Sequence, residues 1–120
     1  MAGLGQRIDT SLMETQLSTM VNVASSYLTT GNDSSKRWGS AHPNIVPYQA
    51  FRTSSGQSIV IACGTDEQFR QLCLLLDRED LASEERFRTN KKRVENRAEL
   101  LNILKIIFLG RTIDFWEVLY

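Results

Sequence analysis

Residues 37–51 read RWGSAHPNIVPYQAF, and this stretch decides the fold. Its first half is rich in small and polar residues and predicts a loop, whereas Ile45–Thr53 has the apolar and aromatic content of a strand. A Ser-Ser-Gly-Gln turn at 54–57 separates it from a second apolar run, Ser58–Cys63. Two such runs joined by a short turn predict an antiparallel hairpin. Because Pro47 cannot donate a ladder hydrogen bond, we expect its strand to be irregular or to lie at an edge.

Helices are expected after the hairpin. Thr65 and Gln68 form a capping pattern, in which each side chain satisfies a free backbone amide at a helix start. The charged segment 77–90 predicts no more than a single turn near Glu84–Phe87. The apolar face expected for the first of these helices comprises Phe69, Leu72, Cys73 and Leu76.

A third helix is expected from about Lys91 to Leu109, with Gly110 as its stop. A further helix begins near Thr112 and continues to the last residue. The residues expected to point inward from the third helix are Val94, Leu101, Leu104, Ile107 and Phe108.

Residues 3–9 are predicted to be the tail of a strand that begins before residue 1, followed by a long helix. Ser11 and Glu14 form its capping pattern, and Gly31 supplies the left-handed C-cap. Twenty residues at 1.5 Å each make a helix about 30 Å long. Its apolar residues recur at helical spacing: Leu12, Met13, Leu17, Met20, Val21, Ala24, Tyr27 and Leu28.

Composition narrows the class of protein. The 120 residues have room for one small domain, and 14 basic residues balance 14 acidic ones, which argues against a nucleic-acid partner. No apolar run approaches the roughly 20 residues of a membrane span, so we expect no membrane partner. With one histidine, a multi-histidine metal cluster is excluded. Cys63 and Cys73 are predicted to be core residues rather than reactive thiols.

Several short motifs follow one another in a defined order: Gly-x-x-His-Pro at 39–43, Pro-Tyr-Gln-x-Phe at 47–51, a glycine-containing turn, and Gly-x-x-x-Gln-Phe at 64–69. In this order they resemble class III CoA-transferases, the family that includes formyl-CoA transferase, carnitine CoA-transferase and α-methylacyl-CoA racemase. Within it the resemblance is closest to succinate–hydroxymethylglutarate CoA-transferase. The similarity covers nearly the whole chain.

The resemblance implies an α+β fold in which a long linker helix, a β-hairpin and further helices form most of the family's small domain. Residues 1–44 would hold the end of a large-domain strand, the long helix and a crossover linker. Residues 45–120 would be the small α+β domain, incomplete at its C-terminus. The chain would then be a fragment, cut at both ends.

The resemblance also implies chemistry. In this family an aspartate attacks the acyl-CoA thioester, and CoA then passes to a carboxylic acid through an aspartyl-CoA intermediate. We expect that nucleophile to lie outside the chain, which would make the isolated 120 residues inactive. Asp9 and Asp66 lie at helix starts, which indicates capping or surface roles. The aspartates available are Asp9, Asp33, Asp66, Asp77, Asp80 and Asp114.

The loop 37–44 is the candidate for substrate contact, because a loop at this place covers the reactive intermediate in related transferases. The candidate substrate-binding residues are Arg37, Gly39, His42 and Asn44. Gly39 would let the backbone approach a ligand, and His42 could donate a hydrogen bond to a carboxylate or thioester oxygen. Alternatively, His42 belongs to a structural turn before the strand. Lys36, Arg37 and the run Lys91–Arg93 could meet CoA phosphates, or form a solvated face.

The remaining expectations concern partners and alternatives. The resemblance implies acyl-CoA and carboxylic acid substrates, CoA as co-substrate with no other cofactor, and an interlocked homodimer of the full-length protein. It implies a mitochondrial location, with a cytoplasmic one as the alternative. Two other functions stay open: a non-catalytic binding or regulatory module of the same fold, and an acyl-CoA racemase relative. A helix-turn-helix DNA binder is disfavoured by the neutral charge.

Overall fold

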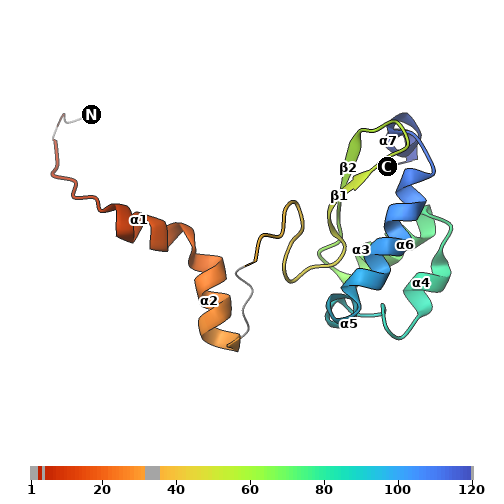
Figure 1. Ribbon diagram of the computed structural model, residues 1–120, viewed down its shortest axis with the longest axis horizontal. Helices are drawn as coiled ribbons and strands as arrows, with labels where there is room; N and C mark the ends of the chain where they lie inside the picture. Colours follow the sequence, from red (N-terminus) through yellow and green to blue (C-terminus); the bar gives the residue numbers. More distant parts are fainter. Residues whose placement is uncertain (1–2, 4, 32–35, 120) are drawn as a thin grey trace. The chain divides into compact units, whose positions relative to one another are not determined.

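The structure, a computed structural model, describes residues 3, 5–31 and 36–119. The chain divides into two compact units, residues 1–37 and residues 38–120 (Figure 1). The assignment of 1–44 and 45–120 to parts of a large and a small domain stays a prediction.

The first unit consists of α1 (Leu12–Thr19) and α2 (Val21–Thr30). The predicted C-cap is confirmed, and at the N-terminal end the Ser11 half of the predicted capping pattern is present. Ser11 Oγ accepts a hydrogen bond from the N–H of Glu14 (3.4 Å). Gly31 adopts φ 68° and donates its N–H to Tyr27 O (2.8 Å), a left-handed C-cap that glycine forms without a Cβ clash.

One expectation for the first unit is wrong. The helix is not continuous, because Met20 leaves helical geometry with φ −90° and ψ 11°. Next to it the Thr19 hydroxyl donates to Gln16 O (2.8 Å), so a side chain competes for a helix carbonyl. Residues 5–10 have no regular secondary structure in this chain, and the expectation that residues 3–9 end a strand of a larger domain stays a prediction. Neither α1 nor α2 has a buried residue.

The second unit contains the predicted antiparallel hairpin, β1 (Tyr48–Arg52) paired with β2 (Ser58–Ala62). Ala50 lies opposite Val60 in its register. The first strand begins at Tyr48 rather than at Ile45. Pro47, which follows a cis peptide bond, has no N–H, and the N–H of Val46 donates to Asn90 Oδ1 (3.1 Å) instead of to a strand.

The hairpin turn is tied to the C-terminal part of the chain. Gly56 has φ 81°, and the N–H of Thr53 donates to Gln57 O (2.9 Å), which closes the turn. The N–H of Ser54 donates to Arg111 O (2.9 Å). This backbone hydrogen bond connects the turn to the segment that leads into the last helix, α7 (Ile113–Leu119).

After the hairpin, α3 (Asp66–Leu75) starts with the predicted capping box of Thr65 and Gln68. The expected turn at Glu84–Phe87 is also present, since the N–H of Phe87 donates to Glu84 O (2.9 Å). A short helix, α4 (Glu79–Ser83), was not predicted. Its only buried residue is Leu81, which is inaccessible to solvent, so tertiary packing stabilises a segment whose local pattern does not predict a helix.

The expected helix 91–109 is two helices, α5 (Asn90–Glu95) and α6 (Arg97–Leu109). They part at Asn96, which has φ −105° and ψ 25°. Its side-chain amide donates to Lys92 O (2.9 Å) and to Arg86 O (3.2 Å). An asparagine that uses its side chain in this way competes with the helical ladder, which explains the break.

The core lies between the hairpin and the helices. In Figure 1, α6 runs alongside the hairpin, and it packs on β1 while α7 packs on β2. The centroid of the Phe108 ring lies 5.0 Å from the centroid of the Phe51 ring and 4.9 Å from that of Trp116. Trp116 Nε1 donates a hydrogen bond to Phe108 O (3.2 Å). A two-stranded hairpin is at best marginally stable alone, so these contacts are what stabilise it. The mixed α+β architecture is the predicted one.

Candidate substrate-binding loop

The candidate site is the His42 loop, residues 38–47, which leads into β1. Gly39 has φ 63°, and the N–H of Ala41 donates to Trp38 O (3.1 Å), so the loop opens with a tight turn. A Cβ added to Gly39 would meet no atom within 4 Å. Glycine is therefore suited to this position by its backbone conformation rather than by lack of space, and the space beside it is open.

The ring of His42 is oriented by three contacts. Its backbone N–H donates to Tyr48 O (2.8 Å), and its ring stacks on the Tyr48 ring at 5.4 Å with an interplanar angle of 14°. The N–H of Asn44 donates to His42 Nδ1 (3.1 Å). Because Nδ1 accepts, the proton of the neutral imidazole lies on Nε2, and no described residue accepts a hydrogen bond from it. His42 therefore combines a structural turn with one free donor.

The four predicted site residues do not all lie in the same unit of the chain. Gly39, His42 and Asn44 come together on the His42 loop. Asn44 is exposed, and its carbonyl accepts from Asn90 Nδ2 (2.8 Å). Arg37 is exposed and belongs to the first unit. The roles of all four in substrate binding stay predictions.

Residues of α5 and α6 that were not predicted as site residues hold the loop in place. Asn90 receives the N–H of Val46 and donates to Asn44 O, and Arg97 donates to His42 O (3.0 Å) and Pro43 O (2.5 Å). Their partners lie more than 40 residues earlier in the chain, so no local pattern in the sequence could have identified them.

Both interpretations of the basic run at 91–93 are wrong for Arg93. It is completely buried, and its guanidinium donates to Val46 O (2.6 Å), Phe87 O (3.0 Å) and Asp66 Oδ1 (2.8 Å). It also lies over the Phe69 ring, with Cζ 4.4 Å from the centroid. Arg93 can neither meet a CoA phosphate nor form part of a solvated face; Lys91 and Lys92 remain exposed.

Asp66 has the structural role that its position at a helix start indicated. Its Oδ1 accepts from the N–H of Asn90 (2.7 Å), the first residue of α5, as well as from Arg93. A carboxylate at this end of a helix satisfies a free N–H and interacts favourably with the helix dipole. One carboxylate thus connects the start of α3 to the start of α5, the helix that contacts the loop.

Both cysteines are buried and free, as predicted. Burial raises the pKa of the Cys63 thiol to about 11. It raises the pKa of the Cys73 thiol to about 12, and the neighbouring Cys63 adds to the effect. Because the thiolate is the reactive form, these side chains are packing residues rather than nucleophiles.

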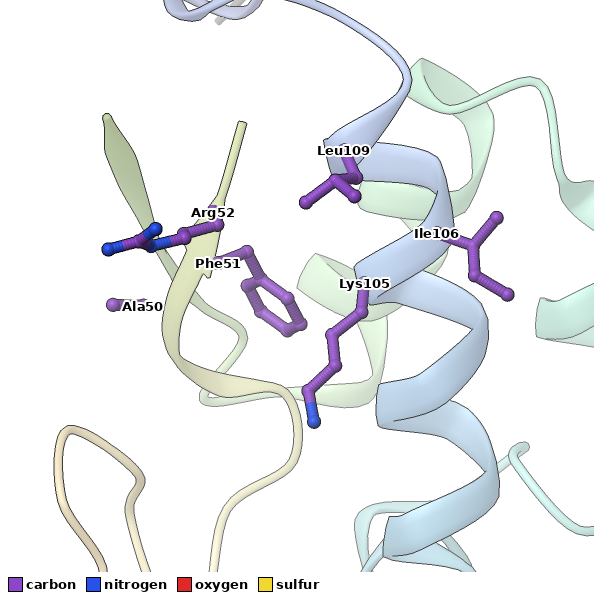
Figure 2. A pocket seen from close by; sticks show the side chains of 6 residues that line it. All are labelled: Ala50, Phe51, Arg52, Lys105, Ile106 and Leu109. Atoms are coloured by element: carbon purple, nitrogen blue, oxygen red, sulfur yellow. The ribbon is translucent and has the colours of Figure 1, made fainter. Parts of the chain in front are cut away.

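A groove of about 430 Å³ lies between β1 and α6 and is lined by Ala50, Phe51, Arg52, Lys105, Ile106 and Leu109. Figure 2 shows the Phe51 ring between the strand and the helix, with Arg52 and Ile106 pointing away from it. Of the lining side chains only Arg52 and Lys105 carry polar groups. The lining of the groove is therefore mostly apolar.

Residues 3, 5–31 and 36–119 contain neither a metal-binding cluster nor a membrane-spanning helix. No three of their His, Cys, Asp and Glu side chains are grouped so that they could hold a metal ion. None of the described helices is both long enough and apolar enough to span a bilayer.

Sequence comparisons add the following findings. The profile of CoA-transferase family III matches residues 1–120. An acyl-CoA transferase of Fusarium pseudograminearum is 45% identical over 118 residues, which cover 98% of this chain and 25% of that protein. The succinyl-CoA:glutarate CoA-transferase of Homo sapiens is 40% identical over 118 residues, covering 98% and 26%. The chain thus spans about a quarter of the length of these relatives.

Solved structures resemble the chain over similar stretches. A CAIB/BAIF family protein from Brucella suis is 42% identical with a TM-score of 0.66, and the match covers 98% of this chain and 31% of that one. The Rv3272 protein from M. tuberculosis has a TM-score of 0.72 at 24% identity, covering 98% and 29%, and supports the fold alone.

Proposed function

Because this chain belongs to CoA-transferase family III, we propose that it is part of an enzyme that moves CoA from succinyl-CoA, or a similar acyl-CoA, to a carboxylic acid. The observation that carries the proposal is the 40% identity to a succinyl-CoA:glutarate CoA-transferase over 98% of the chain. The relatives from Fusarium pseudograminearum and Homo sapiens are both named as transferases. This favours CoA transfer over racemisation or a purely regulatory role.

The reaction proceeds through an aspartate that these 120 residues do not supply. That aspartate attacks the thioester carbonyl, expels CoA as a thiolate and leaves a mixed anhydride. The thiolate attacks the aspartyl carbonyl, releases the donor acid and forms an aspartyl-CoA thioester. The acceptor carboxylate then attacks the aspartyl-CoA thioester, expels the CoA thiolate and forms a second mixed anhydride. The thiolate attacks the acceptor's acyl carbonyl in that anhydride, which forms the new acyl-CoA and releases the aspartate. The exchange is thereby divided into steps that each have a modest barrier.

The surroundings of three of the five described aspartates support an external nucleophile; the other two, Asp77 and Asp114, are exposed. Asp66 is bound by Arg93 and by the N–H of Asn90. Asp80 pairs with Arg78, which holds the pKa of its carboxyl below the usual range. Asp9 pairs with Arg7 on the surface. Asp33 lies outside the described residues. A carboxylate committed to such partners is a poor nucleophile, so we expect the isolated 120 residues to be inactive.

The His42 loop would supply a donor where negative charge develops. The free Nε2–H of His42 can donate to the oxygen of a carboxylate or of a thioester in its tetrahedral state. Gly39 leaves open space for the ligand beside the turn, and Asn44 and Arg37 would contribute further polar contacts. CoA is the co-substrate in this scheme.

The full-length protein would act as an interlocked homodimer. The exposed apolar residues of α1 and α2 support a partner for this unit, since such a stripe is normally covered. Light scattering on the full-length protein tests the dimer, and a monomer would reject it. The resemblance supports a mitochondrial location, with a cytoplasmic alternative, which subcellular fractionation would decide.

The function is tested by incubating the full-length protein with succinyl-CoA and glutarate and separating the CoA esters by chromatography. We expect glutaryl-CoA to appear as succinyl-CoA disappears, with other dicarboxylic acids tested in parallel to find the preferred acceptor. The same assay is run on the isolated 120 residues, which should show no transfer. Absence of transfer to every acid by the full-length protein, or turnover by the isolated chain, would reject the proposal as stated.

A further inference from the structure

The clearest unassigned feature is Arg97, the first residue of α6. Its guanidinium donates from Nη1 to His42 O (3.0 Å) and from Nη2 to Pro43 O (2.5 Å). Its Cζ also lies 4.7 Å from the centroid of the Trp38 ring. Among the described residues no carboxylate lies within ion-pair distance of it, although the side chain is partly buried.

A partly buried cation without a counter-charge is costly unless other groups solvate it. Burial lowers the pKa of Arg97. The two carbonyl oxygens and the face of Trp38 are the groups that compensate, and all three belong to the His42 loop. The loop and Arg97 therefore stabilise each other. Arg86, in the segment between α4 and α5, instead pairs with the carboxylates of Glu84 and Glu99.

The two carbonyls that Arg97 binds are those of consecutive residues, so the guanidinium fixes both peptide planes that follow the His42 Cα. The N–H of His42 is fixed independently by Tyr48 O (2.8 Å). With the backbone held on both sides, the imidazole can keep its stack on Tyr48 and its bond from the Asn44 N–H. The direction of the Nε2–H then follows.

We propose that Arg97 is the positioning residue of the His42 loop. By donating hydrogen bonds to two successive carbonyls, its guanidinium sets the direction of the His42 Nε2–H toward the reacting acyl group. This inference rests on the proposed function and adds a residue to it. A planar guanidinium can bind both carbonyls at once, whereas a lysine ammonium is a point charge on a flexible stem. The proposal therefore distinguishes Arg97→Lys from Arg97→Gln.

The first experiment measures the loop without reference to activity. In the full-length protein, hydrogen–deuterium exchange followed by mass spectrometry compares wild type with Arg97→Gln, Arg97→Lys and the matched surface control Arg86→Gln. We expect amides of residues 41–50 to exchange about tenfold faster or more in Arg97→Gln, less so in Arg97→Lys, and at the wild-type rate in the control. Unchanged exchange in α3 shows that each variant is folded.

The second experiment asks whether Arg97 acts through His42. Misplacing a donor by about 1 Å can cost on the order of 100-fold, so we expect kcat for Arg97→Gln to fall about 10- to 100-fold with a smaller change in KM. Arg97→Lys should recover part of that loss. In the background of His42→Ala, adding Arg97→Gln should cost no more than about twofold, because the group being positioned is already gone.

The outcomes separate this inference from the function on which it rests. If wild type fails to transfer CoA, or His42→Ala has full activity, the proposed site is rejected and the inference with it. If His42→Ala is impaired, the site stands, and the inference alone is overturned in any of three cases: loop exchange in Arg97→Gln equals wild type, kcat is unchanged, or the two substitutions lower activity additively.

Discussion

The two units of the chain have similar apolar patterns but differ in how far their apolar side chains are buried. In the first, Leu12 is 93% exposed and Leu28 is 81% exposed, and no residue of α1 or α2 is buried. In the second, Leu104 and Phe108 have no exposed surface. Helical periodicity thus shows which residues could be buried together, whereas the presence of a facing surface decides whether they are. The stability of the two units should respond differently to the same kind of substitution.

The largest expected effect follows from truncating the aromatic core. Phe108→Ala removes the ring that contacts both Phe51 and Trp116, and should lower the free energy of unfolding of the second unit by about 3–5 kcal/mol. Urea titration measures it. Ile106→Ala, two residues away on α6 and 76% exposed, is the matched control and should change the value by less than about 0.5 kcal/mol. Equal effects of the two substitutions would contradict the observed core.

A smaller loss is expected when the buried Arg93 loses its carboxylate. Asp66→Ala leaves the guanidinium with only its two carbonyl partners and removes the acceptor of the Asn90 N–H at the start of α5. We expect the free energy of unfolding to fall by about 1–3 kcal/mol. Arg93 is completely buried and loses its charged partner, whereas Asp66 itself is half exposed. Thermal unfolding with Asp80→Ala as control compares it with an exposed ion pair. A loss no larger than that of the control would show that water replaces Asp66 without cost.

Alkaline pH should weaken the second unit, in which both cysteines lie. Folding raises the pKa of Cys63 to about 11 and that of Cys73 to about 12 from an ordinary value of 9.0. The folded state therefore holds these protons more tightly than the unfolded chain, so their contribution is complete below pH 9 and is lost as the pH rises through 11 and 12. Urea titrations at pH 8 and pH 10.5 on wild type and Cys63→Ala measure it. The same decline in both proteins would assign it to other groups.

The smallest effect is expected in the first unit. Leu28→Ser replaces an 81% exposed side chain and should change the free energy of unfolding of the second unit by less than about 0.5 kcal/mol. In the isolated 120 residues it should also reduce self-association, which light scattering detects, because it shrinks an exposed apolar surface. Leu104→Ser, at an inaccessible position, is the contrasting variant and should destabilise the unit strongly. Strong destabilisation by Leu28→Ser would show that α2 is packed after all.

Only part of the candidate site could be recognised from short sequence motifs. Gly39 and His42 could be selected from their own motif, because a glycine turn and a His-Pro pair are local signals. The residues that hold them, Asn90 and Arg97, carry no such signal, and Arg93 in the sequence looked like one more solvated cation. Each of these three contacts a segment more than 40 residues away. Their roles depend on which helix end meets which loop.

Local chemistry in the sequence was sufficient for the hairpin, the helix caps at Ser11, Thr65 and Gly31, and the burial of Cys63 and Cys73, since turns, capping and apolar periodicity involve near neighbours. Only the tertiary structure decided that Asn96 interrupts a helix and that Arg93 and Arg97 hold the His42 loop. The physical reason is that burying a polar side chain costs free energy unless it finds hydrogen-bond partners. The partners of Arg93 and Arg97 are far away in the sequence and come within hydrogen-bond distance only when the chain folds.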